Sequence, residues 1–388
     1  MNLSKNIYFD NNATTKVAPE VLQEILPYFS EYYGNPSSAH SFGGNVAKKL
    51  KTAKEKIAGL LGADSEDEII ITSCGTESDN TAINSVLLSY PEKKHIVTTK
   101  VEHPAVLNYC KYLMQRGYKI TFLNVDEKGR LNLDELEKSI NQDTAIVSIM
   151  WANNETGTVF PVLKIAEIVK SKGSLLHTDA VQTVGKIEID LKKSNIDMLS
   201  LSGHKLHAPK GVGVLYLKKK TLFKPFMIGG HQENGLRAGT ENVASIIGLG
   251  KAAELAGKHI KYENSEVKRL RDKLESGLIE KIKLVKINGD IENRLPNTVN
   301  ISFKNVEGEA ILLYMNEKQI CASSGSACTT GSLEPSHVLM AMSVPYEYAH
   351  GSIRFSLSRY NVEEEVDEVI RTMPDIIEKL RAMSPFND

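Results

Sequence analysis

Cysteine is scarce in this sequence, and its four cysteines form no disulfide pattern. Cys74, Cys110, Cys321 and Cys328 are widely spaced, and none belongs to a CxxC pair. A chain of 388 residues can bury a large core without disulfides or metal, so a small secreted disulfide scaffold is excluded. We expect these thiols to stay reduced, which leaves them available for chemistry.

Targeting signals and a surplus of charge are also missing. No apolar segment typical of a secretory signal occurs at the N-terminus, which reads MNLSKNIYFDNNATT. No apolar run approaches the roughly 18 residues that a spanning helix needs. The 47 Lys and Arg balance 48 Asp and Glu, whereas a nucleic-acid binder normally has a basic surplus. We therefore expect a cytoplasmic globular protein that binds neither nucleic acid nor a membrane.

Hydrophobic patterning predicts alternating strands and helices from about residue 46 to residue 260. Short β-rich runs are expected to form strands at 68–72, 95–99, 119–125, 144–150, 174–177, 198–201 and 212–217. Amphipathic stretches between them are expected to form helices, among them 79–89, 105–116, 134–140 and 162–172. Several strands are almost continuously apolar, as expected where both faces of a sheet are covered. The alternation indicates an α/β domain with a mainly parallel sheet and crossover helices.

The pattern changes near residue 251. A long charged helix is expected at 251–283, followed by strands and helices at 299–303, 307–317, 354–357 and 362–383. This mixture predicts a smaller α+β domain after the α/β domain.

Polar residues follow several of the predicted strands. In open α/β sheets, ligands bind beyond the carboxyl ends of the strands. The strand at 68–72 is followed by SCGTESDN, where Thr76 and the amides of a helix N-terminus would suit a phosphate. The next strand ends bring His103, then Asn153 and Asn154, then Asp179 and Gln182, then His204, Lys205 and His207. Each residue alone is more often an ordinary loop residue, but successive strand ends on one edge indicate a functional site.

A lysine, an aspartate and a phosphate site on one edge suit pyridoxal phosphate. Lys205 would form the Schiff base, Asp179 would keep the pyridinium nitrogen protonated, and an imidazole could stack on the ring. The competing interpretation is a metal site built from His103, His177, His204, His207 and His231. No HxxxH or HExxH spacing occurs, and Lys205 lies between the only close pair, so we expect no metal.

Small residues surround Cys328 in the segment CASSGSACTTGSLEP, which spans 321–335. This composition is typical of a mobile loop, whereas Cys321 follows an apolar run and is expected to pack as a small hydrophobe. We expect a helix to begin near Ser332, with Pro335 in its first turn, and its amides would favour a thiolate. The residues alone leave a free loop thiol and a packed structural cysteine open for Cys328.

An ordered set of motifs along nearly the whole chain resembles the cysteine desulfurases of the NifS/IscS type. The motifs are YFDNNATT, GNPSSAH, TESDN, EHPAV, NNETG, HTDAVQ, SGHK, GGHQENGLRAGTEN, SSGSAC and IRFSLSRYN. That family comprises pyridoxal-phosphate enzymes of the class V aminotransferases, with the aspartate aminotransferase fold (fold type I). The resemblance implies a large cofactor domain at 15–256 and a small domain at 1–14 and 257–388. The small domain would carry the catalytic cysteine loop, at about 321–333.

The resemblance also implies a role for each matching residue. Lys205 would carry the cofactor, His103 would stack on its ring and exchange protons, and Cys328 would take the sulfur. Asn154 and Arg354 would bind the substrate carboxylate, for which a guanidinium is well matched. The sequence departs from the family at Cys74 and His231, positions that more often hold glycine. Cys74 would place a second thiol near the cofactor.

Further cofactor contacts are implied for the strand-end motifs. Asp179 would pair with the pyridine nitrogen, and Gln182 would hydrogen-bond the ring hydroxyl. Thr240 would reach the cofactor of the other subunit in a homodimer. The phosphate would be held by Gly75, Thr76, Ser202 and His204. Asn154 would contact the cofactor as well as the substrate.

The implied reaction converts L-cysteine to L-alanine, with sulfur carried on Cys328 as a persulfide. An iron–sulfur scaffold protein would accept this sulfur. A selenocysteine lyase or a cysteine-sulfinate desulfinase on the same cofactor is the alternative, and neither strictly needs Cys328. A transaminase has no use for a loop thiol. A non-catalytic partner-binding subunit would not need Lys205, His103 and Cys328.

Overall fold

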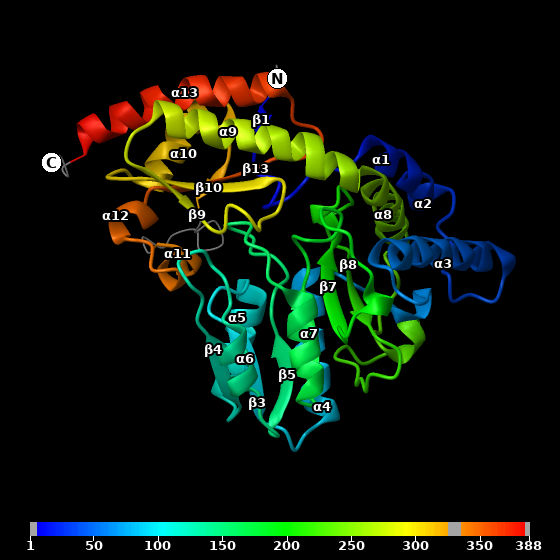
Figure 1. Ribbon diagram of the computed structural model, residues 1–388. Coiled ribbons are helices and arrows are strands. Elements are labelled where there is room, and N and C mark those ends of the chain that lie inside the picture. The colour runs from blue at the N-terminus through cyan, green and yellow to red at the C-terminus, as the bar shows by residue number, and fades with distance from the viewer. Residues whose placement is uncertain (1–5, 325–334, 385–388) are drawn as a thin grey trace.

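The computed structural model describes residues 6–324 and 335–384 of the chain. A seven-stranded sheet forms the centre of its larger part, with strands in the order β2-β8-β7-β6-β5-β3-β4 (Figure 1). The strands are β2 (Ile69–Thr72), β3 (His95–Thr99), β4 (Lys119–Leu123), β5 (Thr144–Ser148), β6 (Leu175–Asp179), β7 (Met198–Ser202) and β8 (Gly213–Leu217). β8 runs antiparallel to both of its neighbours, β2 and β7, and the other neighbouring strands in this sheet pair in parallel. The prediction of a mainly parallel α/β sheet is confirmed.

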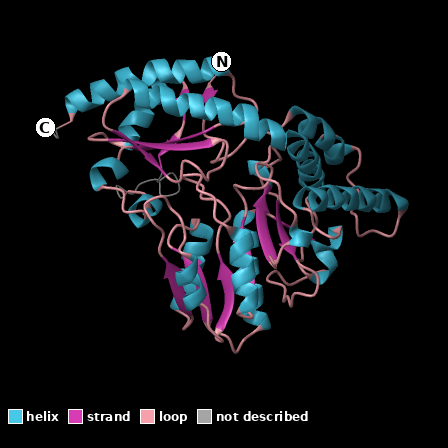
Figure 2. Cartoon of the chain, in the orientation of Figure 1, coloured by secondary structure: helices cyan, strands magenta, loops and turns pink. Residues whose placement is uncertain are grey.

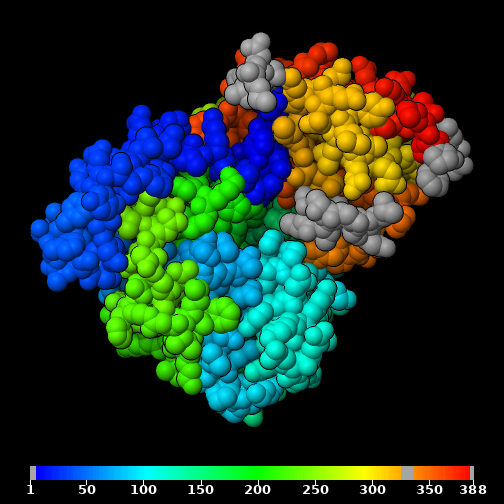
Figure 3. Space-filling model, turned by 180° about the vertical axis from the view of Figure 1, so that it is seen from behind, coloured from blue at the N-terminus to red at the C-terminus, as the bar shows by residue number. Residues whose placement is uncertain are grey.

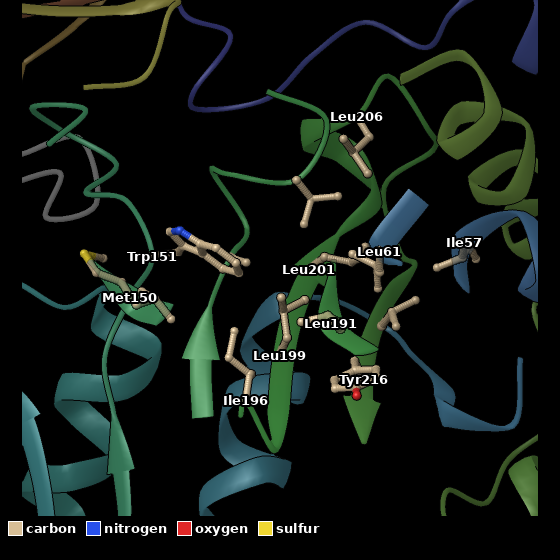
Figure 4. Close-up of a cluster of buried hydrophobic side chains, with 14 of the residues drawn as sticks. Ile57, Leu61, Met150, Trp151, Leu191, Ile196, Leu199, Leu201, Leu206 and Tyr216 are labelled. Atoms are coloured by element: carbon tan, nitrogen blue, oxygen red, sulfur yellow. The ribbon is translucent and has the colours of Figure 1, made fainter. Parts of the chain in front are cut away.

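Helices cover both faces of this sheet (Figure 2). One face packs against α4 (Gly75–Ser89) and α5 (Pro104–Met114). The other face packs against α3 (Ser41–Leu61), α6 (Leu133–Ser139), α7 (Val162–Ser171) and α8 (Val243–Tyr262). Side chains alternate along a strand, so Leu199 and Leu201 of β7 join the second core. Figure 4 shows them with Trp151 and with Ile57 of α3.

The remaining face of β7 is turned toward α4. Met198 packs into the core beneath α4 and α5, and Ser200 and Ser202 follow it at two-residue spacing on the same face. Asp179 is the Cα partner of Ser200 in the parallel ladder between β6 and β7. Polar groups of two strands therefore meet under the first turns of α4, at the carboxyl ends of both strands.

The smaller part of the molecule holds a second sheet in the order β12-β13-β10-β9. Its strands are β9 (Val285–Asn288), β10 (Thr298–Phe303), β12 (Ser323–Ser324) and β13 (Ser352–Ser356). Its helices are α9 (Lys268–Lys281), α10 (Gly308–Glu317) and α13 (Glu363–Met383), of which α9 and α13 lie side by side (Figure 1). These elements share a core of their own, including Leu274, Phe303 and Phe355. This is the α+β unit that the sequence predicts.

Two predicted helix starts are wrong. The helix expected at 251–283 begins at Val243, where the Asn242 side chain accepts the Ser245 amide, and runs through a π-helical turn (Glu263–Val267) into α9. Residues 244–249 hide this start because all of them are buried, so they show no amphipathic pattern. The helix expected near Ser332 is α11 (His337–Ala341), which Ser336 caps, so Pro335 precedes the helix. Ser332 lies outside the described residues.

The N-terminal segment connects the two parts. Strand β1 (Ile7–Tyr8) pairs with β11 (Ile320–Cys321) of the smaller part. The chain then crosses to the larger part, where the Thr15 amide donates to the His204 carbonyl at 3.0 Å. In Figure 3 the blue segment lies between the green and the yellow regions. Three short helices complete the fold: α1 (Pro19–Ile25), α2 (Pro27–Ser30) and α12 (Tyr346–Ala349). In the described chain, no helix has the length and apolarity to cross a membrane.

Candidate active site

One cavity of about 290 Å³ collects the predicted site residues at the carboxyl ends of β6 and β7. Its lining includes Gly75, Thr76, His103, Asn154, Asp179, Gln182, Ser202, His204, Lys205 and Arg354. The volume is near the lower end of the range of about 300–1,000 Å³ that is common for small-molecule sites. Segments far apart in sequence therefore supply one pocket.

Lys205 lies in the short turn (Gly203–Lys205) that follows β7. Its Nζ donates to the backbone oxygens of Asn12 and Ala13, the latter at 2.7 Å. The Gly203 amide donates to the Val212 carbonyl at 2.9 Å, which ties the turn to the segment before β8. The amine is thus held at the cavity by the crossing N-terminal segment.

Asp179 ends β6 and is 7% exposed. Its Oδ1 accepts the Val181 amide at 2.9 Å. Burial raises the pKa of this carboxyl, and the nearby His103 and Lys205 lower it. The Gln182 side chain donates to the Asn12 carbonyl at 3.0 Å, whereas its buried Oε1 has no hydrogen-bond partner among the described residues. A buried acid and an amide oxygen therefore line the same wall.

His103 precedes α5 and caps it. The Ala105 amide donates to its Nδ1 at 3.2 Å, so the neutral ring carries its proton on Nε2. Burial lowers the pKa of this imidazole, Asp179 raises it, and Lys205 and His337 lower it further. The result is a neutral ring that can donate a hydrogen bond from Nε2.

The first turn of α4 forms another wall. A Cβ atom at Gly75 would lie 2.9 Å from Cγ2 of Val181, so glycine allows α4 to approach this loop closely. Cys74 occupies the position before the helix and also lines the cavity. The Nδ1 atom of His204 lies 3.1 Å from the Thr14 hydroxyl, and burial lowers the pKa of this imidazole to about 4. Unpaired amides at a helix start suit an anionic group such as a phosphate.

Arg354, in the middle of β13, reaches the cavity from the smaller part. Its Nη1 donates to the Asn154 carbonyl at 3.0 Å and its Nη2 to Oδ1 of Asp10 at 2.9 Å. The Asn12 side chain also donates to the Asn154 carbonyl, at 3.2 Å. Arg354 thus brings a buried guanidinium from the smaller part to the pocket that Asp179 also lines.

Sequence reasoning missed several residues of this site. Asp79 of α4 lines the cavity at 1% exposure, with its Oδ1 3.5 Å from Nε2 of His177. The hydroxyls of Ser148 and Ser200 contact the two nitrogens of His177 at 2.9 Å each. Burial, then Asp179, raises the pKa of Asp79 well above its usual range. The TESDN motif contains Asp79, but the sequence does not show which of its side chains turns inward.

Two further buried acids flank the pocket. Glu102 accepts the Thr99 hydroxyl at 2.7 Å and the Met150 amide at 3.0 Å, and burial raises its pKa to about 8. Glu155 accepts the Ser336 hydroxyl, and burial raises its pKa to about 7. Both acids lie inside the EHPAV and NNETG motifs, beside residues that the sequence does predict.

One predicted residue lines a different cavity, and another is not described. Thr240 lines a second cavity of about 190 Å³, together with Ser73, Glu233 and Arg237. Cys328 lies outside the described residues. Within 6–324 and 335–384, no three His, Cys, Asp or Glu side chains are grouped so that they could hold a metal ion.

The donor set of the large cavity fits pyridoxal phosphate. The Lys205 amine and the Asp179 carboxyl share the pocket with the start of α4. Gln182 Oε1 and Arg354 Nε are buried without hydrogen-bond partners among the described residues, as polar groups that await a ligand would be.

Comparisons with known proteins match the chain along almost its whole length. Residues 7–369 match the family model described as Aminotransferase class-V. A cysteine desulfurase of Nostoc sp. is 61% identical over 98% of this chain and 95% of its own length. The cysteine desulfurase NifS of Azotobacter vinelandii is 58% identical with the same coverage. A solved structure titled as a NifS-like protein superposes with a TM-score of 0.91 at 42% identity, over 97% of this chain and 100% of the other.

Proposed function

The chain belongs to the class-V aminotransferases and is a pyridoxal-phosphate-dependent cysteine desulfurase of the NifS type, and from this premise we propose how its residues divide the work. The observation that carries the proposal is the single cavity that Lys205, Asp179, His103 and Arg354 share. We assign cofactor binding to the wall formed by the large sheet and substrate binding to the wall formed by Arg354.

Cofactor binding falls to side chains at the strand ends and at the start of α4. Lys205 would hold the cofactor covalently, Asp179 would pair with its pyridine nitrogen, and His103 would lie against the ring. Gln182 would bind the ring hydroxyl through its free Oε1. The phosphate would be held by Gly75, Thr76, Ser202 and His204. When bound, pyridoxal phosphate supplies an electron sink for negative charge that develops at Cα of the substrate.

Arg354 and Asn154 would bind the substrate carboxylate. Arg354 is buried, and a guanidinium presents parallel N–H donors that match a carboxylate. Asn154 lies in the same wall, and its backbone is fixed by Arg354 and Asn12. Binding through the carboxylate would orient the amino group and the thiol of cysteine toward Lys205 and His103.

Proton movements fall to Lys205 and His103. Lys205 Nζ would serve as the base that takes the proton from Cα of the substrate. His103 would transfer a proton only from its protonated form, and the neutral ring would donate a hydrogen bond from Nε2, because its Nδ1 lone pair already accepts the Ala105 amide. Burial, which lowers its pKa, favours the neutral form of this ring at neutral pH.

Cys328 would accept the sulfur of the substrate. Its thiolate would form an S–S bond to the substrate sulfur while the C–S bond of cysteine breaks, and the carbon skeleton would leave as L-alanine. Cysteine plus an enzyme thiol gives alanine plus an enzyme persulfide, so the step needs no oxidant. The persulfide would pass to an iron–sulfur scaffold protein.

We propose that the enzyme is cytoplasmic, because free thiols are stable in a reducing compartment.

A homodimer would complete the site. Thr240 lies in the second cavity, where a partner subunit's cofactor could meet it. Large apolar side chains are exposed in several places. Phe29 lies in α2, Tyr33 in the segment after α2, and Ile228 directly before Gly229. Exposed apolar groups of this kind are typical of a protein interface.

We also propose that the chain divides into a domain at 15–256 and a domain at 1–14 and 257–388.

A product assay tests the assignment of Cys328. Purified holoenzyme with L-cysteine and a reductant should release alanine and sulfide in equal amounts. Cys328→Ala should keep the yellow bound cofactor and its spectral response to cysteine, yet lose sulfide release. Cys321→Ala, which removes a thiol from β11, is the matched control and should retain activity. Wild-type turnover of cysteine by Cys328→Ala would refute the persulfide role.

The same variant separates the related activities. A selenocysteine lyase or a cysteine-sulfinate desulfinase would keep its rate on those substrates without Cys328. Equal rates of Cys328→Ala and wild type on either substrate, with slow turnover of cysteine by both, would favour that alternative. A colourless protein without turnover would indicate a binding subunit.

A further inference from the structure

Arg354 is held by two partners from distant parts of the chain. Its Nη1 is bound to the Asn154 carbonyl and its Nη2 to Asp10, at 3.0 and 2.9 Å. Only 4% of Arg354 is exposed. A guanidinium has five N–H donors, and Nε of Arg354 has no hydrogen-bond partner in the described part of the chain. The side chain is therefore fixed in place and still has donors for a ligand in the cavity.

Asp10 is itself fixed from two directions. Its backbone forms a parallel bridge with Ser356, and the next amide, Asn11 N, donates to the Ser356 carbonyl at 3.1 Å. Its Oδ1 accepts a second hydrogen bond from the Ser323 hydroxyl at 2.8 Å. Ser323 is the Cα partner of Arg354 in the ladder of β12 and β13. One carboxylate oxygen thus receives donors from two facing residues of the small sheet.

We propose that Asp10 is the positioning residue of the substrate-carboxylate site. Its carboxylate holds the guanidinium of Arg354 in the orientation that leaves its remaining N–H donors for the α-carboxylate of cysteine. This inference rests on the proposed role of Arg354. The cavity lining includes Arg354 but not Asp10, so Asp10 acts on the substrate through the arginine.

Arginine has a long side chain with many rotamers, and its ordering costs entropy if it happens on binding. A carboxylate that orders Arg354 in advance removes this cost from substrate binding. We expect the effect to be confined to ligands with a carboxylate, because the carboxylate is the group that we assign to Arg354. The role needs an acceptor oxygen, which asparagine also has, so Asp10→Asn should restore what Asp10→Ala loses.

Steady-state kinetics and ligand binding test the proposal on the holoenzyme. Asp10→Ala should raise KM for L-cysteine by about 10- to 100-fold, the range of a charge-assisted hydrogen bond, while kcat stays within about threefold. Asp10→Asn should return KM to within about threefold of wild type. L-Alanine carries the carboxylate without the sulfur, and its affinity should fall by the same factor in Asp10→Ala. The readout is the fluorescence of Trp151, which precedes the wall residue Ala152 and is the single tryptophan in the sequence.

Two controls define the effect. Cysteamine, which lacks the carboxylate, should bind wild type and Asp10→Ala equally. Asp126→Ala removes an exposed carboxylate paired with Arg130 and should leave KM unchanged. If Asp10→Ala does not fold, Ser323→Ala removes one hydrogen bond to Asp10 and should raise KM by a smaller factor.

Arg354→Ala separates the failure of this inference from the failure of the proposed function. If Arg354→Ala binds L-alanine as wild type does, the carboxylate site itself is misplaced. If Arg354→Ala loses L-alanine binding and Asp10→Ala does not, only the role of Asp10 is overturned. A loss of cysteamine binding in Asp10→Ala, or a failure of Asp10→Asn to restore KM, would also overturn it.

Discussion

The two sides of the cavity are built in different ways. The sheet side is formed by Asp179, Lys205 and His103. The first two lie at or just after the ends of strands of the large sheet, and His103 lies at the start of the helix α5 that packs on this sheet. The junction side pairs Asp10 with Arg354, which lie 344 residues apart in the sequence. Strand topology places the first group automatically, because parallel strands end at the same edge. The second group exists only when the N-terminal segment and the small sheet pack correctly.

The two sides also handle charge differently. On the sheet side, Asp79 and Asp179 are both buried; burial raises the pKa of each, and Asp179 raises that of Asp79 further. On the junction side, Asp10 forms an ion pair with Arg354. We therefore expect changes on the sheet side to alter the cofactor, and changes on the junction side to alter substrate binding and the contact between the two parts of the molecule.

The largest effect is expected from the sheet side at Lys205. Lys205→Ala should lose the borohydride-reducible bond to the cofactor and about 10⁴-fold or more in rate, because it removes both the covalent link and the base. Mass spectrometry after borohydride treatment measures the first effect. Lys210→Ala, an exposed lysine of the same loop, is the matched control and should keep the adduct. An unchanged adduct in Lys205→Ala would place the link on another lysine.

A smaller effect is expected at Asp179. Asp179→Asn keeps an oxygen for the Val181 amide but removes the negative charge that would face the pyridine nitrogen. A charged hydrogen bond contributes about 1.5–3 kcal/mol, so cofactor affinity should fall by about 10- to 100-fold. Reconstitution of the apoenzyme, followed by absorbance, measures this affinity. KM for cysteine should change less than the affinity for cofactor, and the reverse order would contradict the division between the two sides.

On the junction side, Glu155 should make stability depend on pH. Burial raises its pKa from 4.5 to about 7, so the native state binds more protons than the unfolded state between these values. Stability from this group therefore falls as pH rises through that window, by up to about 3 kcal/mol. Glu155→Gln keeps an acceptor for the Ser336 hydroxyl and does not titrate, so its Tm relative to wild type should be higher at pH 8 than at pH 5.

Thermal unfolding at several pH values checks this expectation. Glu309→Gln, at an exposed position in α10, is the control and should shift Tm equally at all pH values. A Tm difference for Glu155→Gln that does not change with pH would show that Glu155 has an ordinary carboxyl pKa despite its burial.

The same contrast explains how much the sequence could predict. Strand ends and their polar residues follow from hydrophobic patterning, and the structure places Asp179, Lys205 and His103 on one cavity as expected. Asp10 lies in a quoted motif, yet no local pattern connects it with Arg354. The inward turn of Asp79 and Glu155 likewise depends on tertiary packing. Periodicity also missed the start of α8, because residues 244–249 are all buried and show no amphipathic pattern.

The smallest effect is expected at Asp79, although it lines the cavity. Burial and the neighbouring Asp179 raise its pKa well above the usual range, which favours the neutral form of Asp79. Asp79→Asn replaces a neutral acid with a neutral amide of the same shape, and cofactor affinity should stay within about threefold of wild type. A loss as large as that of Asp179→Asn would mean that both carboxyls are charged. Two adjacent carboxylates in a dry site rarely both ionise. If Asp79→Asn has little effect on cofactor affinity, Asp179 is the acid that carries the charge.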